Sequence, residues 1–207
     1  MLNWIAKYNL EVLTFITGSF LLCVVAFYPE INLIQKFILA LMWVFTLHEW
    51  EEGKYPGGFI ELMAGNLLQI PVTQDLANRS RIPTMTHILG FTIVPFFLSS
   101  VWWIVLLPVY LGIFEGIVHM AGVKLFKLKK FYTPGMVTAL VELCIGGTCL
   151  GCLIAFYSVP WWDYLIGLTL FFACFALMQS RLTKMVGIRY REFPKIMRSR
   201  VKSLLIG

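Results

Sequence analysis

The sequence contains few charged residues. Asp, Glu, Lys and Arg make up 14% of its 207 residues, whereas soluble domains usually contain about a quarter. Hydrophobic residues account for 59% and are gathered in long runs, which excludes an ordinary soluble domain. The net charge of +6 comes from basic residues between these runs, so it indicates membrane topology and contact with anionic lipid rather than a nucleic-acid partner. The composition therefore predicts an integral membrane protein.

Cysteine is also scarce, with five residues that all fall inside apolar runs. This excludes a disulfide framework of the kind that holds small secreted domains together. Cys149 and Cys152 have the spacing of a redox motif, but Gly147 and Gly151 lie beside them. Small residues four apart allow two membrane helices to approach closely. We therefore interpret this stretch as a face for helix packing.

The apolar runs predict an all-α integral membrane bundle of about six transmembrane helices in one domain, residues 1–180. Residues 59–78 are amphipathic and too polar to cross a membrane, so we expect an interfacial helix that is broken near Pro71. Pro95 falls inside the third run and predicts a short or bent helix there. The six predicted spans are residues 11–28, 34–52, 84–98, 101–123, 135–157 and 164–180.

The basic residues set the orientation of these spans. Except for Lys36, every Lys and Arg lies before the first span, between the second and third, between the fourth and fifth, or after the sixth. The positive-inside rule therefore predicts a multi-pass protein with both termini in the cytoplasm. Residues 181–207 form a basic, amphipathic tail that we expect at the cytoplasmic membrane surface. Within it, Arg189 and Arg191 are candidates to bind the phosphate-bearing headgroup of a substrate.

Only three histidines occur, and all of them fall in the cytoplasmic halves of predicted spans. His48 is followed at helical spacing by Glu51 and Glu52, so the three side chains project to one face. Ionisable residues inside a membrane are costly and mark functional sites. Because helices of alternating direction place such residues at similar depth, we predict that they converge on one metal site, formed by His48, Glu51, Glu52, His87, Glu115, His119 and Glu142.

The residue types in this set point to transition metals. Imidazole suits zinc, iron and copper, and several carboxylates add manganese. Three imidazoles and four carboxylates exceed what one closed site needs, so the set favours two ions, with iron preferred over zinc or manganese. The spacing differs from that of soluble di-metal bundles, in which the carboxylate precedes the histidine by three residues.

Such a site supports several functions. The first is oxidation of a lipid-like hydrophobic substrate from the bilayer, and Glu51 and Glu115 are the candidate catalytic carboxylates. The second is zinc-dependent hydrolysis of a lipid, with one of these two residues as general base. The third is a path for metal ions or protons, although the outer halves of the spans lack ionisable residues. The fourth is a scaffold with a metal-free polar core, whose basic tail binds anionic lipid or a partner.

The string His48-Glu-Trp-Glu51-Glu52, followed by a later span histidine and by Glu115 and His119, resembles the HXXEE-domain family of small polytopic membrane proteins. The resemblance covers most of the chain, from about the first to the sixth predicted span. It implies that His48, Glu51 and Glu52 are the key positions. It says little about the reaction, because the family is named for this motif and has no well-defined activity.

Overall fold

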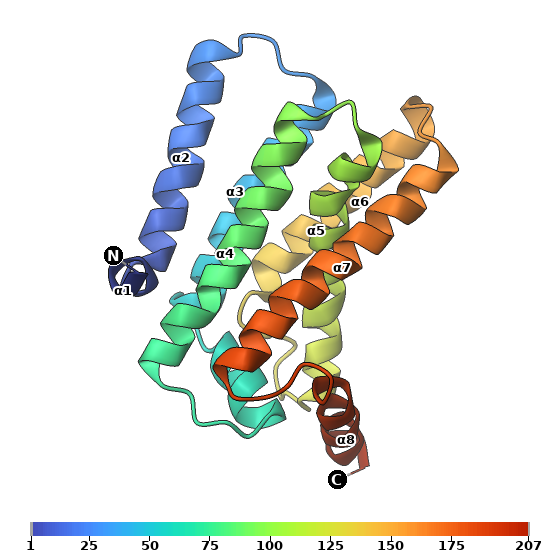
Figure 1. Cartoon of the computed structure of the whole chain (residues 1–207). Coiled ribbons are helices and arrows are strands. Elements are labelled where there is room, and N and C mark those ends of the chain that lie inside the picture. Colours follow the sequence, from blue (N-terminus) through green and yellow to red (C-terminus); the bar gives the residue numbers. More distant parts are fainter. Residues whose placement is uncertain (1, 207) are drawn as a thin grey trace.

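The computed structural model describes residues 2–206, and within them the chain is helical with no β-strand (Figure 1). This confirms the predicted all-α fold. The elements are α1 (Leu2–Lys7), α2 (Asn9–Phe27), α3 (Leu33–Gly53), the π-helix η1 (Glu61–Leu67), α4 (Gln74–Phe97), α5 (Trp102–Leu125), α6 (Met136–Phe156), α7 (Trp161–Met185) and α8 (Phe193–Ile206).

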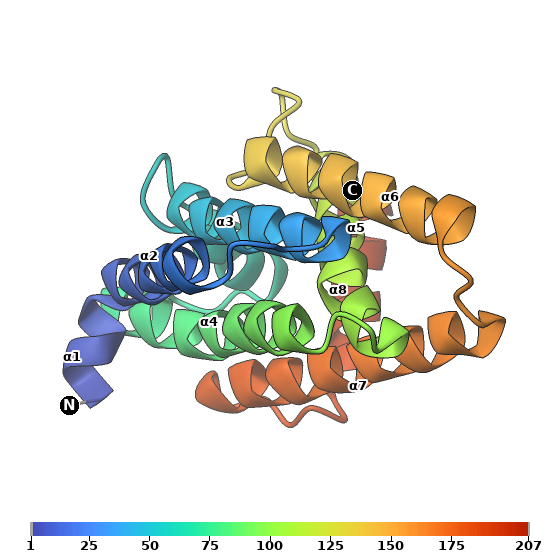
Figure 2. The same cartoon turned by 90° about the horizontal axis from the view of Figure 1, so that it is seen from above.

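Helix α5 is the central element of the bundle. It packs against α3, α4, α6 and α7, while α2 packs on α3 and α4. Viewed from above, α2, α3 and α6 lie in one row, and α4 and α7 lie in a second (Figure 2). The buried core of the bundle is apolar and includes Leu41, Phe45, Phe96, Leu106 and Phe171. Close packing of this core fixes α3, α5 and α6 relative to one another, so side chains from these three helices can form a defined site.

Four helices, α2, α5, α6 and α7, are long and apolar enough to cross a membrane. Helix α3 coincides with the second predicted span, but its last two turns carry one histidine and three glutamates. Helix α4 begins at Gln74, well before the predicted span 84–98, and continues through Pro83 and Pro95. The chain is thus built as a membrane protein with four candidate spans, and the count of six remains a prediction.

The segment 59–78 is interrupted around Pro71, where the sequence predicted a break, and its position at the membrane interface remains a prediction. The π-helix η1 ends at Leu67, a stretch without regular structure follows around Pro71, and α4 begins at Gln74. The Thr73 hydroxyl accepts a hydrogen bond from the Leu76 amide at 3.2 Å, which satisfies one of the free amides at the helix start. Helix η1 contacts α8, and both lie at the end of the bundle that carries the α5–α6 loop (Figure 1).

Glycine brings α5 and α6 together, but at a different position from the one that the sequence indicated. A Cβ added to Gly146 would lie 3.0 Å from the carbonyl oxygen of Val109 on α5. Gly147 and Gly151 are exposed, and nothing lies within 4 Å of a Cβ at either position. The predicted packing face at Gly147 and Gly151 is therefore wrong. Neighbouring residues on a helix point about 100° apart, so the face next to Gly147 is the one that meets α5.

Candidate metal centre

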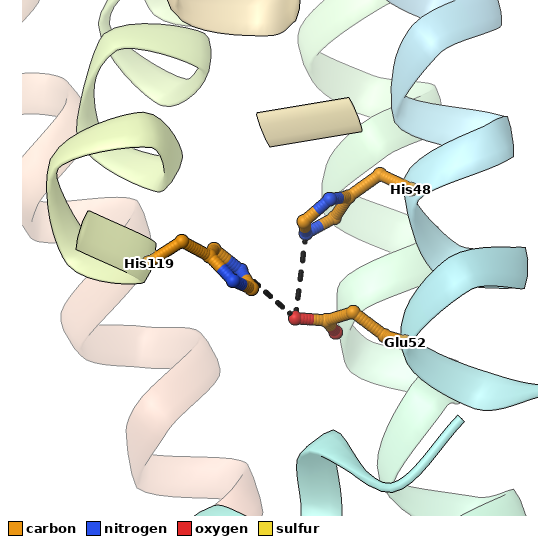
Figure 3. A group of neighbouring side chains, drawn as sticks. All are labelled: His48, Glu52 and His119. Atoms are coloured by element: carbon orange, nitrogen blue, oxygen red, sulfur yellow. Dashed lines mark ion pairs between the residues drawn. The ribbon is translucent and has the colours of Figure 1, made fainter. Parts of the chain in front are cut away.

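Two imidazoles and one carboxylate meet between α3 and α5. His48 and Glu52 are four residues apart on α3 and share one helix face, and His119 comes from α5. His48 Nε2 lies 3.4 Å and His119 Nε2 lies 3.2 Å from the same atom, Glu52 Oε1 (Figure 3). Both rings are buried, and the Glu52 side chain is 15% exposed. We refer to these three residues as the His–Glu–His group.

Hydrogen bonds on the far side of each ring fix its orientation. His48 Nδ1 lies 3.1 Å from the Gly135 carbonyl oxygen, which can only accept, and His119 Nδ1 lies 2.8 Å from the Thr133 hydroxyl, which accepts in the tautomer with the proton on Nδ1. A neutral imidazole has one proton, so a proton on Nδ1 leaves a free lone pair on Nε2. Metal-binding histidines are usually held in this way by a second partner. The turn before α6 therefore directs both Nε2 atoms toward Glu52.

Three electron-pair donors thus face one another in a buried place. Within the described residues, His119 Nε2 has no hydrogen bond of good geometry, and its polar neighbour is Glu52 Oε1 at 3.2 Å. Two ligand atoms about 2.1 Å from one ion, at a tetrahedral angle, are about 3.4 Å apart. The separations here are 3.4 and 3.2 Å, and all three ligand atoms lie within 4.8 Å of one another. The group could therefore hold a metal ion.

Glu51 is not part of this group and has a different role. Its carboxylate accepts hydrogen bonds from the Tyr132 hydroxyl at 2.9 Å, the Val137 amide at 3.2 Å, and the amide and hydroxyl of Thr138 at 2.9 and 2.6 Å. The two amides belong to the first turn of α6, whose free N–H groups favour a negative charge. Burial, and then the hydrogen bond to Glu51, raise the pKa of Tyr132 to about 12, so the phenol keeps its proton. Glu51 thus joins α3 to the turn that orients both histidines.

Gly135 lies against all three members of the group. Its φ of +93° is in the left-handed region that favours glycine. A Cβ added there would lie 2.7 Å from Glu52 Cγ and 2.8 Å from the Cε1 atoms of His48 and His119. The site therefore requires glycine at this position for two reasons: the backbone is left-handed, and there is no room for a Cβ between the three side chains. No sequence pattern identified Gly135, because the requirement arises only when α3, α5 and α6 meet.

Two further predicted ligands flank the group. Glu115 Oε2 lies 3.9 Å from His119 Nε2, and Glu142 Oε1 lies 3.8 Å from His48 Nδ1. Glu142 is fully buried, and neither of its carboxylate oxygens has a hydrogen-bond partner in the described part of the chain. A buried carboxylate without partners is costly unless a cation or a proton neutralises it. Glu115 therefore lies next to His119 and Glu142 next to His48, and neither carboxylate belongs to the three-residue group.

A family model described as "Protein of unknown function with HXXEE motif" matches residues 39–150, more than half of the chain. The chain belongs to this HXXEE family. No curated protein and no solved structure matches it. In this HXXEE protein the motif is His48–Glu52, and the matched range also contains the residues from α5 and α6 that complete and flank the group. The geometry assigns different roles to the motif: His48 and Glu52 point at His119, and Glu51 holds α6.

The remaining predicted residues of this HXXEE protein lie elsewhere. The ring nitrogens of His87 lie 3.1 Å from the Pro83 carbonyl oxygen and 2.8 Å from that of Cys174. His87 thus ties α4 to α7, and the structure does not bring it into the His–Glu–His group. Arg189 lines a shallow groove after α7, and Arg191 is exposed. The sequence argument grouped His87 with His48 and His119 only because their predicted depths in the membrane are similar. Depth in the membrane does not determine which neighbouring helix a side chain faces.

A cavity of about 190 Å³ lies beside the group, and Glu52 lines it. Glu49, one residue after His48, lines the same cavity and is buried, and sequence reasoning did not single it out. The ring of Phe59, just before η1, stacks on that of His119 with centroids 5.0 Å apart. Most of the other lining residues are apolar and come from η1, α7 and α8, among them Met63, Leu182 and Phe193. The HXXEE site is thus open on one side to an apolar space.

Proposed function

We propose that this HXXEE protein is a membrane-embedded, metal-dependent enzyme that acts on a lipid-like hydrophobic substrate. The observation that carries the proposal is the convergence of His48 Nε2 and His119 Nε2 on one oxygen of Glu52. Glu52 also lines the apolar cavity. A metal held by the group would therefore lie at the wall of a space that suits a hydrocarbon chain.

The membrane arrangement that goes with this function has six spans. Helices α3 and α4 lie side by side with the four candidate spans and would supply the other two (Figure 1). The loops at the end with η1 and α8 carry most of the basic residues. By the positive-inside rule this end, with both termini, faces the cytoplasm. The metal group and its cavity then lie in the cytoplasmic leaflet, where η1 and α8 rest in the interface.

One ion is the number that the geometry favours. Within the described residues, a single group of three His, Cys, Asp or Glu ligand atoms comes within reach of one ion. Two imidazoles and one carboxylate are the ligands of many non-haem iron(II) oxygenases, so iron remains the preferred metal. A second ion would need Glu115 and Glu142, which lie 3.9 Å from His119 Nε2 and 3.8 Å from His48 Nδ1 and do not join the group of three. We therefore replace the two-ion hypothesis with a one-ion site in our proposal.

Oxidation of the substrate is the reaction that the surroundings favour. Hydrolysis needs donors for a developing oxyanion. The hydroxyls nearest the group are already used, because Tyr132 and Thr138 donate to Glu51 and Thr133 holds His119, so this role would fall to Arg81 in the cavity. Oxidation of a C–H bond needs the chain to be held beside the metal and water to be excluded. Phe59, stacked on His119, and the apolar lining of the cavity meet both needs.

Zinc-dependent hydrolysis is the second candidate, and Glu115 favours it. Two histidines and a glutamate also form the catalytic zinc set of several hydrolases. The carboxylate of Glu115, 3.9 Å from His119 Nε2, is placed to accept a proton from a water molecule in the site. A transport path has less support. Leu41 lies about two turns from His48 along α3, and Leu41, Met42, Phe45 and Leu106 are fully or almost fully buried apolar residues on that side.

Oxygen uptake tests the proposal. Protein purified in detergent is loaded with iron(II) or with zinc and incubated with the lipids of the membrane from which it was isolated. We expect oxygen consumption by the iron form of the wild type and of His87→Ala, and none above background in His119→Ala. Release of acid from lipid by the zinc form, abolished in Glu115→Gln, would support hydrolysis instead. If no metal form of the protein shows either activity, the proposal that it is an enzyme is contradicted.

A further inference from the structure

The cavity beside the His–Glu–His group has two unlike walls. One wall consists of apolar residues from η1 and α8, including Met63, Ala64 and Met197. The lining residues from α3 and α4 include charged ones, namely Glu49, Glu52 and Arg81. A ligand that fits both walls has an apolar chain and a polar end. The cavity therefore selects an amphiphile rather than a plain hydrocarbon.

Arg81 is the cation of this cavity. Its guanidinium lies over Gly53, where a Cβ would be 2.8 Å from Arg81 Cζ, and its Nη2 donates to the Gly53 carbonyl at 3.3 Å. A guanidinium has five N–H donors, so this bond leaves most of them unused. In the described part of the chain, Arg81 forms no ion pair with Asp or Glu within 4.0 Å. Arg81 shares the cavity with Glu49 and Glu52 but pairs with neither at 4.0 Å, so its free N–H groups can bind an anionic ligand.

The size of the cavity limits the ligand to one chain. Its volume is about 190 Å³, below the roughly 300–1,000 Å³ of pockets that enclose a drug-sized ligand. This volume matches a segment of one acyl chain and is too little for the paired chains of a phospholipid.

We propose that the substrate class is a single-chain amphiphile with an anionic head, either a carboxylate or a phosphate, and that Arg81 binds this head. The proposal rests on the enzyme function given above. Gly53 directly follows Glu52, so a head bound at Arg81 places the first carbons of the chain nearest the metal group. The rest of the chain lies along η1 and α8. Arg81 thereby selects both the substrate and the position at which it reacts.

Direct binding tests this assignment. Wild-type protein in a non-ionic detergent is equilibrated with tritiated oleate, with oleoyl lysophosphatidate or with oleyl alcohol, which has the same chain and no charge. We expect at least one anionic ligand to bind about tenfold or more tightly than the alcohol. Tight binding of oleate alone identifies a fatty-acid head, and tight binding of lysophosphatidate alone identifies a phosphate head. Equal binding of all three ligands would overturn the proposal.

Variants connect the binding to Arg81 and to the cavity. Arg81→Gln should remove the preference for the anion, and Arg81→Lys, which keeps the charge, should retain most of it. Arg79→Gln is the matched control, because Arg79 lies on the same helix but pairs with Asp75 at 2.9 Å and does not line the cavity. Ala64→Trp should block binding by filling the cavity. Asn66→Trp, at an exposed position of η1, should not.

Wild type stripped of metal with a chelator separates the two proposals. It should still bind the anionic amphiphile, because Arg81 and every residue that lines the cavity are unchanged. If wild type binds metal but does not prefer the anionic ligands over oleyl alcohol, the proposed substrate class is refuted and the metal site is unaffected. Arg81-dependent binding by a protein that takes up no metal would refute the enzyme and leave an anionic-amphiphile site. Unchanged anion preference in Arg81→Gln would contradict the assignment of the head to Arg81.

Discussion

Replacement of Gly135 by alanine tests the geometry of the metal centre. The added Cβ would lie 2.7 Å from Glu52 Cγ and 2.8 Å from Cε1 of His48 and of His119, whereas ordinary Cβ contacts are 3.4–4 Å. The three ligand side chains must therefore retreat by roughly 0.6 Å or more, and they have little room in a packed core. Disturbance of the groups that hold metal ligands lowers affinity by about 10- to 100-fold. We expect a loss of this size in Gly135→Ala.

Gly187 provides the control for backbone strain. Its φ is also positive, +75°, but nothing lies within 4 Å of a Cβ at this position. Alanine with left-handed backbone costs about 1–2 kcal/mol at either residue, so both variants should lose thermal stability. Only Gly135→Ala should lose metal affinity, measured by competition with a chelator of known affinity. If Gly135→Ala and Gly187→Ala bind metal equally well, the reasoning from the close approach of Gly135 is refuted.

Three further variants test how the site is supported. Glu51→Gln should weaken metal binding about tenfold without removing a ligand, because the α6 turn loses its charged acceptor; chelator competition measures this. Gly146→Leu should lower the thermal unfolding midpoint strongly and Gly147→Leu hardly at all, because only Gly146 faces Val109 closely. Tyr132→Phe should cost at most about 1 kcal/mol near neutral pH, because the phenol is partly exposed. The folded-state pKa of Tyr132, about 12, exceeds its ordinary value of 10.0, so this contribution is complete below pH 10 and is lost as pH rises toward 12.

Each of these three predictions has a result that would contradict it. Metal affinity in Glu51→Gln equal to wild type would show that the capped turn does not orient the histidines. Equal midpoints for Gly146→Leu and Gly147→Leu would contradict the packing of α6 on α5. A stability difference between Tyr132→Phe and wild type that stays constant from neutral pH to pH 12 would show that the hydrogen bond to Glu51 does not depend on the neutral phenol.

The sequence indicated α2, α5, α6 and α7 well because each is a long apolar run with clear breaks, whereas the polar first turns of α4 from Gln74 were not assigned to that helix. It located the site because His48, Glu52 and His119 are ionisable residues in apolar helices, and such residues are rare enough to be informative. It could not separate Glu52 from Glu51. Both share a face with His48 and lie on either side of it, and only the packed bundle shows that Glu51 faces α6 and Glu52 faces α5.

Other features depended wholly on tertiary contacts. Helix period alone did not decide between Gly146 and Gly147, because both lie in an apolar helix with no polar face to orient it. The depth of His87 matched that of the other histidines, but its ring faces carbonyls of α4 and α7. Gly135 and Arg81 gain their roles from neighbours distant in the chain. Such contacts leave no local periodicity that a single sequence could reveal.

Metal content is the most direct test of the central claim. Wild type, His48→Ala, His119→Ala and His87→Ala are purified after expression with iron, zinc or manganese supplied, and metal per protein is measured by mass spectrometry of the elements. The account predicts about one ion per chain in wild type and in His87→Ala, whose histidine lies outside the group, and almost none in the other two. Metal content that is the same in all four proteins, or absent from all four, would contradict it.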